Sequence, residues 1–118
     1  MLISLSTGKM VDRIPTSRRE MWGTIISRLS KDDLKAIFEE IETLTTGKKI
    51  SVSSWIPKSR CWTDTPFQVI YDKAAKENYE LAGYMFGLIV WVYFNDDLRH
   101  WGFGHFTDEI QGLTYFLI

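Results

Sequence analysis

The chain has 118 residues, 45% of them hydrophobic and 25% charged, a composition that excludes an intrinsically disordered protein. This length suits one domain with one core, so we expect a single globular domain over residues 1–118. The formal net charge of −1 argues against a phosphate backbone as the main partner, and we therefore expect no nucleic-acid partner.

Cysteine content and apolar run lengths bear on the compartment. Cys61 is the only cysteine, so neither an intramolecular disulfide nor a cysteine-based metal site can form. The N-terminus lacks the charged and apolar regions of a signal peptide, and the apolar run Leu81–Phe94 is shorter than the roughly 20 residues that cross a bilayer. We expect a soluble, cytoplasmic protein with no cofactor and no membrane partner.

The first half of the chain carries two helix-start signals. Residues 1–15 are expected to be irregular or strand-like, and Ser17 with Glu20 forms the pattern of a capping box. Ser30 with Asp33 starts a second helix, whose apolar positions run at helical spacing to Leu44. The join between these two helices is so short that they should form an angled pair.

The middle of the chain alternates between strand and helix signals. Residues 50–56 alternate apolar and polar side chains and predict a half-buried strand. Thr65, Pro66 and Gln68 restart a helix that either continues or breaks near Asn78 before the apolar run Leu81–Phe94.

The C-terminal segment, residues 100–118, reads as a β-hairpin, because aromatic and β-branched runs flank turn residues 108–112. This order of elements predicts an α+β fold. We expect a small antiparallel sheet, built from the strand near residues 50–56 and the hairpin, packed by about four helices, one of them fully apolar.

The apolar helix is the least usual feature, because a helix that is apolar all round is normally buried. It is either the central core helix of a monomer or a core helix with one face in a homodimer contact. Gly83 and Gly87 would let another backbone approach closely, with Tyr84 and Met85 beside them. We expect a homodimer on this basis.

The two histidines give little support to a metal site. Positions 100 and 105 face opposite sides of a regular strand, so His100 and His105 cannot share one ion without a bulge, and we expect no metal. A single histidine acting as a general base stays open beside a purely structural role in aromatic surroundings.

A set of aromatic and polar side chains from the loop after the strand and from the hairpin is a candidate ligand-binding cleft. Such clefts are mostly apolar with a few polar groups. The alternative is that these aromatics complete the core. The candidate residues are Trp55, Arg60, Trp62, Arg99, His100, Trp101 and His105.

Several short motifs lie between residues 54 and 118. They are Ser54-Trp55-Ile56-Pro57, Trp62, Thr65-Pro66-Phe67, Ile70-Tyr71, Phe86-Gly87, Val90-Trp91, Trp101-Gly102-Phe103-Gly104 and Gly112-Leu113-Thr114-Tyr115-Phe116. This set resembles small, functionally uncharacterised proteins encoded by mobile integron gene cassettes in bacteria. The resemblance implies a bacterial, cytoplasmic accessory protein and no site residues.

No catalytic constellation is recognisable in the sequence, so the leading hypothesis is a non-catalytic protein-interaction or self-association module. A small-molecule binding domain that uses the aromatic cleft is the alternative. An enzyme that relies on one histidine is the third reading.

Overall fold

The computed structural model describes residues 1–4, 7–45, 49–51, 62, 64–105 and 113–117. Helices dominate and strands accompany them, which confirms the mixed class at this coarse level. In chain order the elements are the 3-10 turn η1 (Thr16–Arg18), the helices α1 (Arg19–Arg28) and α2 (Lys31–Leu44), the strand β1 (Lys49–Ser51), the π-helix η3 (Ile70–Ala74), the helix α3 (Tyr79–Asp96), and the strands β2 (Trp101–His105) and β3 (Leu113–Leu117).

The strands form an antiparallel sheet in the order β1-β3-β2. Within the predicted hairpin, β2 pairs with β3 so that Phe103 lies opposite Tyr115. The other edge of β3 pairs with β1, where Ile50 lies opposite Tyr115. The predicted strand over residues 50–56 is represented by β1, and its remainder, like the predicted turn at 108–112, lies outside the described residues.

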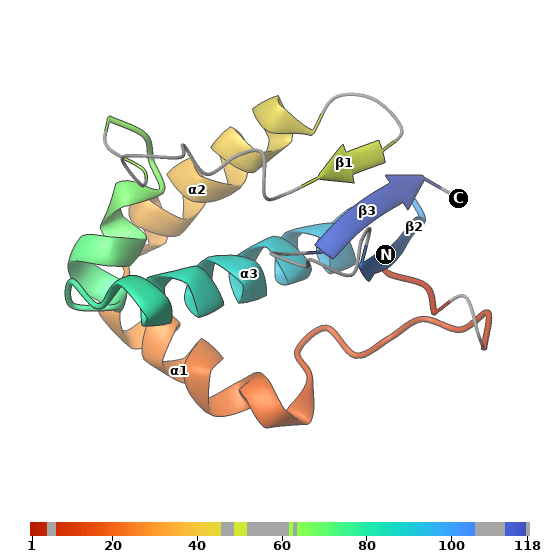
Figure 1. The fold of residues 1–118 in the computed structure, drawn as a ribbon, viewed down its shortest axis with the longest axis horizontal. Coiled ribbons are helices and arrows are strands. Elements are labelled where there is room, and N and C mark those ends of the chain that lie inside the picture. Colours follow the sequence, from red (N-terminus) through yellow and green to blue (C-terminus); the bar gives the residue numbers. More distant parts are fainter. Residues whose placement is uncertain (5–6, 46–48, 52–61, 63, 106–112, 118) are drawn as a thin grey trace.

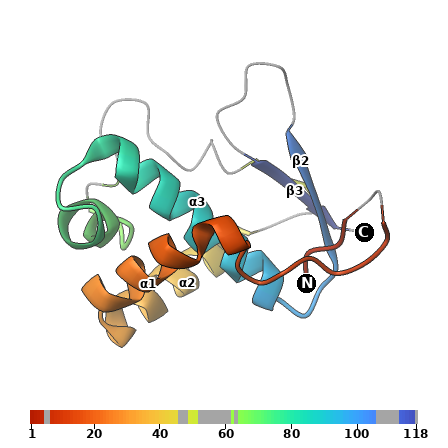
Figure 2. The same ribbon diagram turned by 90° about the horizontal axis from the view of Figure 1, so that it is seen from below.

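Helix α3 is the axis of the molecule. Figure 1 shows it running between α1 and α2, with the strands gathered near its C-terminal half. In Figure 2, turned by 90°, α1 and α2 overlap in projection and the N-terminal part of α3 lies off to one side of both. Ring contacts of Phe94 with Trp101 and with Tyr115 join α3 to the sheet, at centroid distances of 4.8 and 4.0 Å.

The predicted start of α2 is confirmed. Ser30 accepts a hydrogen bond from the Asp33 amide at 3.0 Å, and the Asp33 carboxylate accepts one from the Ser30 amide at 3.1 Å. This reciprocal pair satisfies two backbone donors that the helix itself leaves open. The helix ends at Leu44, and Thr45 is its C-cap residue.

The predicted capping box before α1 is wrong. The chain already turns at η1, where the Arg18 amide donates to the Pro15 carbonyl at 2.8 Å. Ser17 therefore lies inside a turn rather than in the extended conformation of an N-cap residue. Helix α1 begins at Arg19 with no side-chain cap bond.

The helix predicted from Thr65 is shorter than expected, because turns lead into the π-helix η3 over only five residues. Lys76 and Glu77 then adopt positive φ angles of 49° and 64°, which interrupt any helix. Asn78 caps α3 by accepting a hydrogen bond from the Leu81 amide at 3.0 Å. The helical pattern is therefore interrupted before α3 and does not continue through Asn78, which decides between the two alternatives that the sequence left open.

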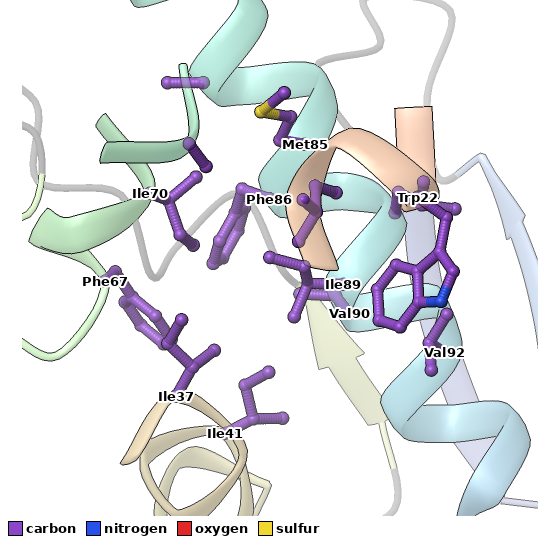
Figure 3. Close-up of a cluster of buried hydrophobic side chains, with 14 of the residues drawn as sticks. Trp22, Ile37, Ile41, Phe67, Ile70, Met85, Phe86, Ile89, Val90 and Val92 are labelled. Carbon is purple, nitrogen blue, oxygen red and sulfur yellow. The ribbon is translucent and has the colours of Figure 1, made fainter. Parts of the chain in front are cut away.

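The core lies where α1, α2, η3 and α3 meet, and Figure 3 shows Trp22, Ile37, Phe67 and Phe86 converging there from different elements. Helix α3 supplies the largest share. Its buried residues are Ala82, Met85, Phe86, Leu88, Ile89, Val90, Val92 and Phe94. Among the described helices, none combines the length and apolarity needed to cross a membrane.

Helix α3 is a core helix, but it is not covered on every side. Gly83 and Gly87 are exposed, and Tyr84 is 59% exposed. These residues form one stripe of α3 that the described elements leave uncovered.

Candidate interaction surface

The outer face of α2 and one tyrosine of α3 form a surface groove with a volume of about 410 Å³. Helix α2 turns Ile37 and Ile41 fully into the core, and a face beside this buried one is accessible to solvent. Residues three or four apart lie on one side of a helix, so this face forms a continuous stripe. Its members are Lys31, Leu34, Lys35, Phe38, Glu39 and Glu42, and Tyr93 of α3 completes the groove.

The groove has an apolar floor. Phe38 and Tyr93 stack with ring centroids 6.3 Å apart and an interplanar angle of 30°. Leu34 lies on the same face one turn before Phe38, and all three side chains are only partly buried. Burial raises the pKa of Tyr93, and the negative charges of Asp97 and Glu42 raise it further. Tyr93 is therefore neutral at physiological pH.

Charges border this floor in a fixed order, with two lysines in the first half of the stripe and two glutamates in the second half. Lys35 and Glu39 form the stripe's ion pair at 4.0 Å, with side chains 76% and 65% exposed, so it contributes little to stability. The helix dipole favours acidic residues at the start of a helix and basic residues at its end. The order in the stripe is the reverse.

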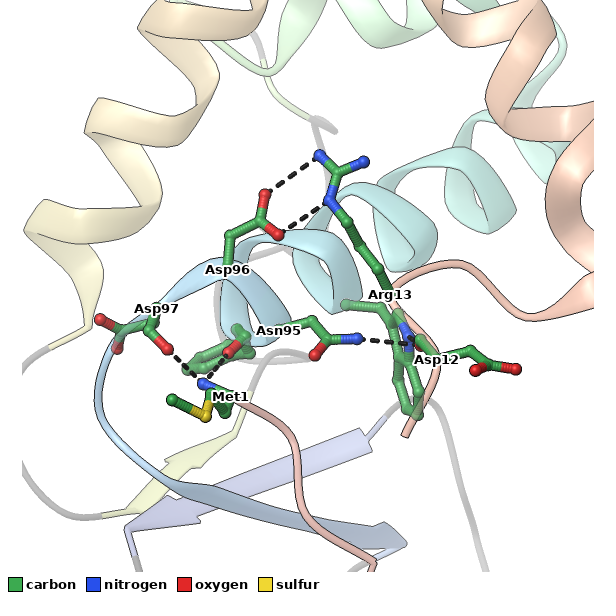
Figure 4. Close-up of polar contacts among 8 residues, drawn as sticks. Met1, Asp12, Arg13, Asn95, Asp96 and Asp97 are labelled. Atoms are coloured by element: carbon green, nitrogen blue, oxygen red, sulfur yellow. Dashed lines mark hydrogen bonds and ion pairs between the residues drawn. The ribbon is translucent and has the colours of Figure 1, made fainter. Parts of the chain in front are cut away.

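A polar network holds the C-terminal end of α3 (Figure 4). Arg13 donates two hydrogen bonds to Asp96, at 2.8 and 3.0 Å, and the Asn95 side-chain amide donates to the Asp12 carbonyl at 2.9 Å. The Met1 amino group donates to the carbonyls of Phe94, at 3.0 Å, and of Asp97. Burial lowers the pKa of this amino group, and the nearby aspartates oppose that shift. The network fastens the first residues of the chain to the helix.

Asp97 is the most enclosed carboxylate of this network. It accepts hydrogen bonds from the indole Nε1 of Trp101 at 2.8 Å and from Nε of Arg99 at 2.9 Å. Burial acts to raise the pKa of Asp97, but these two hydrogen bonds outweigh it and hold the pKa below its usual value. A carboxylate that is already engaged and has a lowered pKa is a poor general base. The arrangement is structural in character.

Two of the three tryptophans predicted to line a cleft, Trp62 and Trp101, lie in separate aromatic clusters. Trp62 is 4% exposed and packs on Phe86 with centroids 5.1 Å apart, whereas Trp101 is fully buried against Phe94 at 4.8 Å. Eight residues of α3, roughly 12 Å of helix, separate these two contacts. Both tryptophans complete the core, which was the alternative to the cleft.

The remaining candidates for the cleft are only partly described. The Arg99 guanidinium lies over the Trp101 ring, 5.0 Å from its centroid, and His100 is exposed just before β2. Trp55 and Arg60 lie outside the described residues. His105 belongs to β2, and its side chain is likewise outside what the structure describes. The structure thus brings Arg99 and Trp101 together and separates both from Trp62.

Of the four residues predicted for self-association, three are exposed and one is buried. Gly83, Tyr84 and Gly87 lie on the exposed stripe, and a Cβ atom added at either glycine would meet nothing within 4 Å. The prediction for Met85 is wrong, because it is 1% exposed. Successive helical residues are about 100° apart, so Met85 faces the core while Tyr84 faces solvent.

A second hollow, also about 410 Å³, lies between the N-terminal segment and α1 and contains Arg13, Arg19, Trp22 and Gly23. The Arg13 guanidinium lies 5.7 Å from the centroid of the Trp22 ring. Asp96 already neutralises Arg13, so the hollow is a weaker candidate for an anion site than its two arginines suggest.

The α2 groove is not evident from the sequence, because Leu34 and Phe38 share the helical spacing of the residues that face the core. A usable signal is present at helical spacing, where Lys31 and Lys35 precede Glu39 and Glu42 on one side of the helix.

No protein-family model, no curated protein and no solved structure matches the chain. Within the described residues, no group of three or more histidine, cysteine or acidic side chains is placed to hold a metal ion.

Proposed function

We propose that the protein is a non-catalytic self-association module that pairs through the α2 groove. The observation that carries this proposal is the partly exposed apolar floor of Leu34, Phe38 and Tyr93, bordered by two lysines and two glutamates. An apolar centre inside a charged border is the usual anatomy of a protein interface. Two-fold pairing is the commonest closed assembly of soluble proteins.

The exposed stripe of α3 is the competing surface for self-association. Gly83 and Gly87 would permit close helix contact, and Tyr84 offers an exposed aromatic ring beside them. This stripe has no charge pattern that specifies a partner, whereas the α2 stripe has one. We therefore favour the α2 groove.

The resemblance to integron-cassette proteins supports a bacterial, cytoplasmic accessory role for this module. Self-association would then be the property through which the protein acts, without chemistry of its own.

Light scattering coupled to size exclusion, over a tenfold dilution series in the micromolar range, tests the proposal. We expect the wild type to show twice the chain mass of 13.8 kDa. Leu34→Glu should reduce the mass toward that of one chain, because it places a carboxylate in the apolar centre. Thermal unfolding of this variant checks that it remains folded.

Gly83→Ala/Gly87→Ala is the matched control. Alanine is the better helix former by up to about 1 kcal/mol at each site, and open space surrounds both positions. The variant should unfold at a higher temperature and keep the wild-type mass. A wild type of single-chain mass throughout would reject self-association, and loss of the dimer only in the glycine variant would move the contact to α3.

A further inference from the structure

The charge order along α2 is complementary to itself when the helix is reversed. The midpoint of Lys35 and Glu39 is residue 37, and the midpoint of Lys31 and Glu42 lies between residues 36 and 37. Leu34 and Phe38 have their midpoint at residue 36. A single two-fold axis at this point of the helix would therefore place both charged pairs and the apolar pair opposite their counterparts in a second copy.

We infer that two copies of this chain pair α2 against α2, antiparallel, about a two-fold axis near residues 36 and 37. This inference rests on the proposed self-association and adds its geometry and its specificity. Each Lys35 then lies opposite Glu39 of the second copy, and each Lys31 lies opposite Glu42. The partner is a second copy because the complementary pattern is the chain's own.

Parallel pairing of the same faces is disfavoured by the same charges. It would place lysine beside lysine and glutamate beside glutamate, and like charges facing each other are costly. The apolar centre does not distinguish the two orientations, because Leu34 and Phe38 are adjacent on the face. The four charged residues therefore decide the orientation of the pair.

Stability of the isolated helix does not account for the charge order. Lysines in the first half and glutamates in the second are arranged against the helix dipole. The i,i+4 pair between Lys35 and Glu39 is long, at 4.0 Å, and both side chains are largely exposed. For Lys31 and Glu42, the described part of the chain shows no ion pair. A partner helix would give both of them one.

Charge inversion provides the test. One variant carries Lys31→Glu/Lys35→Glu, so that its stripe is wholly acidic, and a second carries Glu39→Lys/Glu42→Lys, so that its stripe is wholly basic. Each should have a dimer dissociation constant at least about tenfold higher than the wild type, because every facing pair becomes repulsive. Both changes bring charges into line with the helix dipole, so both variants should stay folded, which thermal unfolding checks.

Mixing the two variants in equal amounts should restore a dimer, because every acidic position then faces a basic one. Native mass spectrometry identifies this species as the heterodimer by its mass. A chain with all four charges inverted should again form a homodimer. Restoration in both experiments supports the antiparallel register.

The negative outcomes separate the two proposals. A wild type that is monomeric at every concentration overturns the self-association itself. Wild-type dimers that persist unchanged in both charge variants leave self-association standing and overturn the α2 pairing. Variants that are monomeric alone and remain so when mixed overturn the charge pairing, and a monomeric chain with all four charges inverted overturns the antiparallel register.

Discussion

Two phenylalanines of α3 act as centres of separate aromatic clusters. Phe86 contacts Trp62 and Phe67, each at a centroid distance of 5.1 Å. Phe94 stacks on Tyr115 at 4.0 Å and meets Trp101 edge-on at 4.8 Å. The first cluster joins α3 to the segment before η3, and the second joins it to the sheet. Single side chains thus connect distant parts of the chain.

Phe86→Ala should lower the free energy of unfolding by about 3–5 kcal/mol, because it removes a buried ring from a packed aromatic cluster. Tyr84→Ala, two positions earlier on the same helix, is the matched control. Its side chain is 59% exposed, so the change should stay within about 0.5 kcal/mol. Denaturant unfolding measures both, and equal effects would contradict the burial pattern of α3.

At the scale of the elements, the N-termini of the helices differ in how they are capped. A reciprocal pair of hydrogen bonds caps the N-terminus of α2, and an asparagine side chain caps the N-terminus of α3. The α2 start is tied further to η3, where Lys73 contacts Asp33 at 3.1 Å. The amide of Ser30, with Lys73 assisting, lowers the pKa of Asp33 despite some burial. The start of α1 relies instead on the preceding turn.

Ser30→Ala should cost about 1 kcal/mol of stability, because it removes the oxygen that caps the Asp33 amide. Ser17→Ala provides the comparison. The sequence pattern gives Ser17 the same role, but α1 has no side-chain cap bond, so this change should be close to neutral. Thermal or denaturant midpoints of the two variants decide the matter. A comparable loss in both would mean that Ser17 does cap α1.

At the scale of the whole molecule, the N-terminal residues and the sheet are joined side by side. Leu2 is fully buried and forms a parallel bridge with Trp101. The Ile3 amide donates to the Trp101 carbonyl at 2.9 Å, and the Trp101 amide donates to the Met1 carbonyl at 2.8 Å. Tyr115 of the central strand packs on Phe94 of α3. Sheet, N-terminus and α3 therefore form one packed unit.

Burial of Tyr115 predicts a loss of stability in alkali. Burial raises its pKa well above the ordinary value of about 10, so only the unfolded chain ionises this phenol once the pH exceeds 10. The stabilisation is complete below pH 10 and is lost as the pH rises toward the folded-state pKa.

Denaturant unfolding between pH 8 and pH 11.5 measures this loss. The free energy of unfolding should fall above pH 10 in the wild type and fall less steeply in Tyr115→Phe. Identical slopes for the two proteins would contradict the burial of this hydroxyl.

The sequence by itself determined features that depend on neighbouring residues. The predicted capping box of Ser30 and Asp33 is confirmed because it needs only a side chain and a backbone amide three residues away. The mixed helix and strand class follows from local periodicity in the same way. Where the preceding backbone was already turned, as at Ser17, the same local pattern failed.

Only the tertiary structure decided which apolar surfaces are covered. An apolar run shows that a helix has more to bury than one face, but the placement of the other elements determines which side stays open. Tyr84 and Met85 are neighbours in sequence, yet one faces solvent and the other the core, because the packed elements cover only part of the circumference of α3. For the same reason, Trp62 and Trp101 joined different clusters, and the α2 groove emerged only once Tyr93 of α3 was in place beside Phe38.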